Sequence, residues 1–119
     1  MRIHRDPLDI LFSQLVRLLA DGKCEYCKKV STLECSHFHS RRKRSVRFDI
    51  DNAAGLCFSC HQHLGENPYL HVEFFKKRLG SERFEQLNIR AETLVKRTPK
   101  DKEQLKSDLK EKIRRLEHT

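Results

Sequence analysis

No run of apolar residues in this sequence approaches the ~18 that a membrane span needs. A signal peptide is lacking as well, because Met1 to Asp6 lead directly into a mixed segment without a long apolar core. Internal repeats and low-complexity tracts are also absent. These absences predict a cytoplasmic protein rather than an exported or membrane-bound one.

Hydrophobic residues are scarce, at 37% of the 119 positions, while charged residues make up 35%. A chain of this length and composition is expected to form one domain with a small core, which a bound metal ion would help to stabilise. The net charge of +8 and the pI near 9.5 favour a polyanionic partner, with nucleic acid ahead of a membrane surface. Abundant lysine is also an ordinary way to stay soluble, so charge alone does not decide the partner.

Five cysteines are present, and four of them form two C-x-x-C pairs, Cys24 with Cys27 and Cys57 with Cys60. In a chain without an export signal, such cysteines indicate metal ligands rather than disulfides. Two C-x-x-C pairs supply the four thiolates of a closed tetrahedral site, so the sequence predicts a structural Zn²⁺ ion. That ion would close a loop over residues 28–56.

The fifth cysteine, Cys35, lies in a segment from Val30 to His37 whose β-branched residues and partial alternation predict a strand. On a strand, Leu33, Cys35 and His37 share one face. We interpret Cys35 as a small buried hydrophobe beneath the candidate site, rather than as a zinc ligand or a reactive thiol.

The loop between the cysteine pairs holds His-Phe at 37–38 and Arg-Phe-Asp-Ile-Asp-Asn at 47–52, and His61 follows the last cysteine. This order of His, Asn and His around two C-x-x-C pairs resembles the HNH endonucleases, the ββα-metal nucleases, in the zinc-braced form of small phage and bacterial proteins. The resemblance covers about residues 24–67. It implies an α+β, treble-clef-like module. Local sequence signals flank this module, within one domain (1–119), by a helix over 6–21 and helices over 68–119.

The resemblance also implies a role for each motif residue. His37 would be the general base that activates water, Asn52 would orient that base by holding the loop, and His61 would bind a catalytic cation. Consecutive residues of a helix are rotated by ~100° about its axis. His61 is therefore expected to face His37 while Cys60 faces the zinc.

The position directly before the base departs from the pattern, because many members have Asp or His there and this chain has Ser36. A hydroxyl is a weak ligand, so the second ligand of the catalytic cation is left open. The candidates are Ser36, His39, Asp49, Asp51 and Glu66. An imidazole with oxygen ligands suits Mn²⁺ or Mg²⁺.

A basic run separates His37 from Asn52, with no acidic residue between positions 41 and 47. Its members are Arg41, Arg42, Lys43, Arg44 and Arg47. A charge run is usually just a solvated face, but the place of this run between two candidate catalytic residues predicts that it grips DNA phosphates.

Local signals place the remaining elements. Asp6-Pro7 and Asp21-Gly22 bound a first helix, and a short helix is expected from about Cys57 to Leu64. Further helices follow over 67–80 and from Ser81 through Val95, before Thr98-Pro99. The last segment carries a narrow apolar stripe made of Leu105, Leu109, Ile113 and Leu116. This stripe fits docking on the domain, pairing with a second chain or lying along DNA.

The sequence thus predicts a metal-dependent DNA endonuclease of low sequence specificity, active as a monomer or a homodimer. With one centre per chain, a monomer should nick one strand. A non-catalytic zinc module that binds nucleic acid is the alternative, and a zinc-stabilised protein-interaction module is a third reading. The discriminating feature is the presence of both His37 and His61, since a pure binding module has no need of them.

Overall fold

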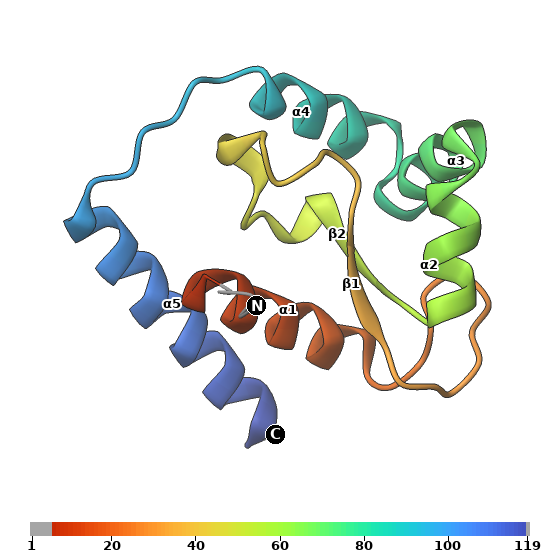
Figure 1. The fold of residues 1–119 in the computed structure, drawn as a ribbon, viewed down its shortest axis with the longest axis horizontal. Helices are drawn as coiled ribbons and strands as arrows, with labels where there is room; N and C mark the ends of the chain where they lie inside the picture. Colours follow the sequence, from red (N-terminus) through yellow and green to blue (C-terminus); the bar gives the residue numbers. More distant parts are fainter. Residues whose placement is uncertain (1–5, 119) are drawn as a thin grey trace, which may run out of the picture.

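The computed structural model describes residues 6–118, and its helices and strands form an α+β fold, as predicted (Figure 1). The order is α1 (Pro7–Ala20), β1 (Glu34–His37), two 3₁₀ turns η1 (Arg44–Val46) and η2 (Ile50–Asn52), β2 (Ala53–Leu56), α2 (Phe58–Gly65), α3 (Pro68–Leu79), α4 (Ser81–Ala91) and α5 (Pro99–Glu117). None of the helices described combines the length and the apolar character that a membrane span requires.

The two strands form an antiparallel hairpin whose two faces are covered by different helices. Cys35 pairs with Gly55 and His37 with Ala53, and these positions face α1. Glu34 pairs with Leu56 and Ser36 with Ala54, on the face toward α2 and α3. Because side chains alternate along a strand, His37 and Glu34 lie on opposite faces of the sheet.

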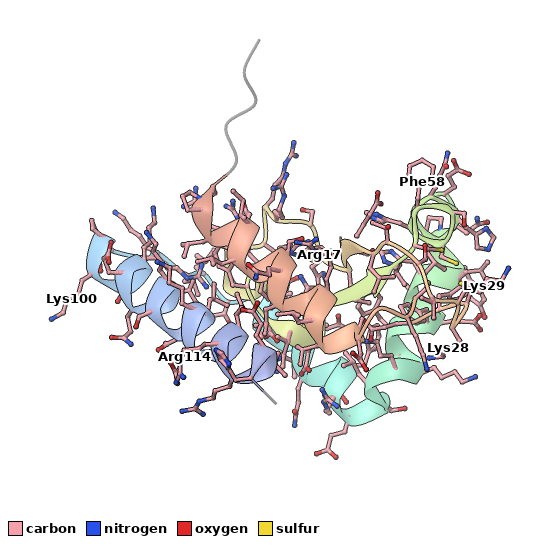
Figure 2. All side chains as sticks on the ribbon, turned by 90° about the horizontal axis from the view of Figure 1, so that it is seen from below. Arg17, Lys28, Lys29, Phe58, Lys100 and Arg114 are labelled. Atoms are coloured by element: carbon pink, nitrogen blue, oxygen red, sulfur yellow. The ribbon has the colours of Figure 1, made fainter. Side chains whose placement is uncertain are left out.

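Helix α1 begins at Pro7, where the Asp6 side chain accepts a hydrogen bond from the Leu8 backbone N–H, and it ends at Asp21 in the left-handed conformation. Its buried residues Phe12 and Val16 contact the sheet, and α5 packs along its other side (Figure 2). The stripe of Leu109 and Ile113 is therefore buried against α1. Docking on the domain is thus the arrangement found for α5.

Two elements are shorter than predicted. Strand β1 begins at Glu34 rather than Val30, because β2 ends at Leu56 and offers no partner to the residues before Glu34. Helix α4 ends at Ala91, so Leu94 lies outside it and is 99% exposed. The predicted continuation through Val95 is wrong, since a turn at residues 92–93 and an irregular segment lead to the capping box of Thr98 and Asp101 that starts α5.

Gly55 marks the closest approach of α1 to the sheet. A Cβ atom at this position would lie 2.7 Å from the Cβ of Ala20 and 3.4 Å from a methyl group of Leu33. The absence of a side chain is therefore what lets the helix pack directly on β2.

We expect Gly55→Ala to lower the free energy of unfolding by about 1–3 kcal/mol, because the new methyl group forces α1 away from β2. Denaturant unfolding of the zinc-loaded protein measures this change. The matched control is Gly65→Ala, at a helical position with nothing within 4 Å, where the change should be neutral or stabilising by roughly 0.5–1 kcal/mol. Equal stabilities for the two variants would contradict the close approach.

Candidate nuclease site and zinc centre

The four predicted zinc ligands come together in space. One ligand atom from each of Cys24, Cys27, Cys57 and Cys60 lies within 4.8 Å of the others, and the sulfurs of Cys27 and Cys57 are 3.9 Å apart. Thiolates bound at about 2.3 Å in a tetrahedron are separated by roughly 3.8 Å. The cluster therefore fits Zn²⁺, which would tie the turn after α1 to the start of α2.

Backbone geometry prepares both halves of this cluster. The first pair sits on a turn in which Lys28 N–H donates to Cys24 O at 2.8 Å and Lys28 adopts a φ of 68°. The second pair brackets the first turn of α2, with Cys57 as its N-cap residue. Hydrogen bonds from the Ser59 hydroxyl and the Cys60 backbone lower the pKa of Cys57 to about 6, which favours the thiolate that a metal requires.

The fifth cysteine lies apart from this cluster. Cys35 is partly buried against the α1 face of the sheet, and burial raises the pKa of its thiol to about 12. A thiol with so high a pKa stays protonated and unreactive, in agreement with its interpretation as a small hydrophobe.

Asn52 is fully buried, and its amide closes the loop between the strands. Its Nδ2 donates to the carbonyls of His39 and Val46 at 3.0 and 3.1 Å, and its Oδ1 accepts from the His39 N–H at 2.8 Å. Three hydrogen bonds to backbone groups thus fix the chain that leaves β1. This chain begins at His37, so the amide holds the position of that residue indirectly.

His37 is the last residue of β1, and its ring lies between α1 and the loop. The Nε2–H donates to the Arg47 carbonyl at 3.0 Å, and the ring centroid is 5.6 Å from that of Phe12. A carbonyl oxygen only accepts, so this bond selects the tautomer in which Nδ1 keeps its lone pair. Burial lowers the pKa of His37 below its usual value, which keeps the ring neutral near pH 7.

His61 projects from α2 toward the opposite face of the sheet. Its Nδ1 lies 2.7 Å from Oε1 of Glu34 on β1. This contact brings His61 to the face of the hairpin opposite the one that carries His37, which differs from the expected orientation toward His37. Glu34 and His37 are also three residues apart along β1, which corresponds to roughly 10 Å.

The candidates for a second cation ligand have varied surroundings. The carboxylates of Asp49 and Asp51 form ion pairs with Arg90, and Asp51 also pairs with Arg83. His39 lies beyond the end of β1, where its Nε2 is 2.8 Å from Oδ1 of Asn88. Within residues 6–118, the four cysteines are the only group of three or more His, Cys, Asp or Glu side chains spaced to hold a metal.

Ser36 and Glu66 complete the predicted set of second ligands. Ser36 is 2% exposed, on the α2 face of the sheet. Glu66 caps the C-terminal end of α2, where Gln62 donates to its carboxylate. Glu66 is exposed, and no contact joins it to His61 in the part of the chain that the structure describes.

The basic run splits into two groups. Arg41, Arg42, Lys43 and Arg44 are exposed, as expected for a solvated loop, although Arg41 also reaches Asp9 at 3.4 Å and Val46 is fully buried. Arg47 instead faces α1, where Asp9 accepts a hydrogen bond from its Nε at 3.0 Å and holds its pKa above the usual value. Arg47 is therefore paired within the protein, and its contact with DNA stays a prediction.

Comparison with known families gives a single result. Residues 24–67 match the HNH endonuclease family. This match confirms the resemblance inferred from the motif, and it covers both cysteine pairs, His37, Asn52 and His61. It supports a function of the nuclease type. The chain matches no curated protein and no solved structure.

Helix α4, outside the matched HNH segment, holds the loop of that segment in place. Arg90 pairs with Asp49, Asn88 bonds to His39, and Glu92 pairs with Lys43. No local sequence signal points to these partners. Strand alternation places Glu34 on the face opposite His37, but only the packing of α2 on that face shows that Glu34 meets His61.

We expect Asn52→Ala to destabilise the HNH segment by about 3 kcal/mol, because it leaves three backbone groups of the loop without partners in a buried position. Denaturant unfolding with saturating zinc measures the loss. Asn67→Ala removes a hydrogen bond to the His63 carbonyl at an exposed site and should change stability by less than about 1 kcal/mol. Similar effects of the two substitutions would show that the buried amide does not hold the loop.

Proposed function

We propose that the protein is a divalent-cation-dependent DNA endonuclease in which His37 is the general base. The observation that supports this most directly is the hydrogen bond from His37 Nε2–H to the Arg47 carbonyl. It leaves Nδ1 with a free lone pair on a neutral ring, which is the form that takes a proton from water. Asn52 is the positioning residue, since its amide fixes the backbone that carries the base.

His61 is the proposed ligand of the catalytic cation. A bound Mn²⁺ or Mg²⁺ would supply positive charge for the phosphate and for the departing oxygen. In an in-line displacement the attacking and leaving oxygens lie on opposite sides of phosphorus. A base on one face of the hairpin and a cation ligand on the other are compatible with that requirement, provided that the phosphate lies at the end of β1.

The four exposed basic residues of the loop, Arg41, Arg42, Lys43 and Arg44, are the proposed phosphate contacts. They follow shortly after β1, the strand that ends with the base, with residues 38–40 between. Contacts to phosphates position a duplex but carry no sequence information, so low sequence specificity follows. With one such centre in each chain, a monomer would nick one strand, and a homodimer would be needed to cut both in one event.

Nicking of supercoiled plasmid tests the proposal. With Mn²⁺ or Mg²⁺ the wild-type protein should produce open circles, and EDTA should abolish them. His37→Ala should lower the rate by roughly 10²–10⁴-fold, because the water loses its proton acceptor. In the wild type, the acidic limb of the pH–rate profile should have its midpoint below 6.5, because the pKa of His37 is lowered and activity is lost as the base becomes protonated.

His63→Ala is the matched control for that experiment, since it removes an imidazole from an exposed position on α2 and should leave the nicking rate unchanged. Zinc content and circular dichroism establish that both variants are folded. If the wild type binds DNA but does not cleave it whichever divalent cation is added, the alternative of a non-catalytic nucleic-acid-binding zinc module replaces the nuclease.

The basic loop generates a separate prediction about DNA affinity. Replacing Arg42 and Arg44 by Ala should reduce the slope of log affinity against log salt by about 2, since two fewer phosphate contacts release counterions. Lys100→Ala with Lys102→Ala removes the same charge from the exposed start of α5 and serves as the control. A slope that changes only in the α5 variant would move the DNA-binding surface to that helix.

A further inference from the structure

The contact between Glu34 and His61 is not required by the roles of general base, positioning residue and cation ligand proposed for His37, Asn52 and His61. The two side chains reach each other from β1 and α2, with Oε1 and Nδ1 2.7 Å apart. They are 43% and 40% exposed, so the contact is open to solvent rather than enclosed in the core. An isolated ion pair at such an exposed position contributes little to stability. A role in stability is therefore a weak explanation for this arrangement.

A carboxylate oxygen and an unprotonated ring nitrogen both present lone pairs, so they repel each other at this separation. Something positive must lie between them, either a proton or a metal ion. Two ligand atoms bound at about 2.1 Å and at right angles around one ion are about 3 Å apart. The observed spacing is that of a hydrogen bond from a protonated Nδ1, and it is also within a few tenths of an ångström of the spacing of neighbouring ligands in one coordination shell.

We propose that Glu34 is the second protein ligand of the catalytic cation and binds it together with His61. This inference rests on the proposed function and extends it, because it supplies the carboxylate that Ser36 does not. Glu34 and Ser36 share the α2 face of the sheet. Glu34 lies two residues before Ser36 on the same face and has a longer side chain than Asp. Its carboxylate thus supplies the ligand that Ser36, directly before the base, does not.

The surroundings of the other carboxylates favour Glu34. Asp49 and Asp51 are neutralised by Arg90 and Arg83. In the part of the chain that the structure describes, Glu34 contacts His61 and is paired with no lysine or arginine. Its negative charge is therefore available to a cation.

The pair also predicts which ion is bound. Two protein ligands leave most of the coordination shell to water and to phosphate oxygens, as is usual for Mg²⁺ and Mn²⁺ in phosphoryl chemistry. An imidazole nitrogen raises the affinity for Mn²⁺ relative to Mg²⁺. We therefore expect the site to bind Mn²⁺ more tightly than Mg²⁺, and both more tightly when DNA is present.

Titration of the zinc-loaded protein with Mn²⁺, followed by the electron paramagnetic resonance signal of the free ion, measures binding without any requirement for cleavage. Glu34→Gln keeps the shape of the side chain and removes its charge. It should weaken Mn²⁺ binding on the order of 10-fold or more, as His61→Ala should, and the double variant should lose less than the sum of the two. Glu66→Gln, which neutralises an exposed carboxylate at the C-terminal end of α2, should bind Mn²⁺ like the wild type.

Zinc release after thiol modification should be the same in all variants, because none of the substitutions touches the four cysteines. Unchanged Mn²⁺ affinity in Glu34→Gln would overturn the inference and leave Glu34 the role of orienting the His61 ring. A wild-type protein that binds no Mn²⁺, with or without DNA, would overturn it as well.

Plasmid nicking by the wild type, measured in parallel, separates this inference from the proposed function. Mn²⁺ binding that depends on Glu34 in a protein that cuts no DNA would support the cation site and reject the nuclease. If the protein nicks DNA and Glu34→Gln leaves its Mn²⁺ affinity unchanged, the nuclease proposal is supported and Glu34 is rejected as a cation ligand.

Discussion

The rest of the structure depends on four cysteine sulfurs that converge from two distant parts of the chain. They join the turn after α1 to the first turn of α2, across a loop of residues 28–56. A chain with so few hydrophobic residues would gain from such a link, because a metal bound by the four sulfurs would replace part of the apolar core that a domain of this size otherwise needs. The hairpin and both candidate catalytic histidines are positioned relative to this cluster.

Next to this cluster, the two faces of the hairpin have different environments, one on the side of α1 and one on the side of α2. On the α1 side, His37 is half-buried, neutral and bonded to a backbone carbonyl, which suits proton transfer. On the α2 side, Glu34 and His61 are half-exposed and carry the ligand atoms that a divalent cation prefers. Because a strand directs alternate side chains to opposite faces, one short strand supplies groups to both environments.

The helices outside the matched segment have a definite part in this arrangement. Helix α1 neutralises Arg47 through Asp9, and α4 holds η2 and the loop through Arg90 and Asn88. These contacts fix a loop that would otherwise be mobile, since it is rich in like charges that repel one another. Arg42 and Arg44 are left facing solvent. The basic run thus has one residue held by internal ion pairs, Arg47, and two that are open to a ligand, Arg42 and Arg44.

The sequence by itself determined the zinc ligands, the α+β class, the caps of α1 and the identity of the motif residues, because each of these depends on local spacing or on short-range hydrogen bonds. Only the tertiary structure decided that His61 meets Glu34 rather than His37, that Arg47 is paired with Asp9, and that α4 ends before Leu94. The physical reason is that the first two outcomes depend on which face of the two-stranded sheet each helix covers, and the third on the irregular link between α4 and α5. That choice is made by packing between residues far apart in the chain, for which no local pattern exists.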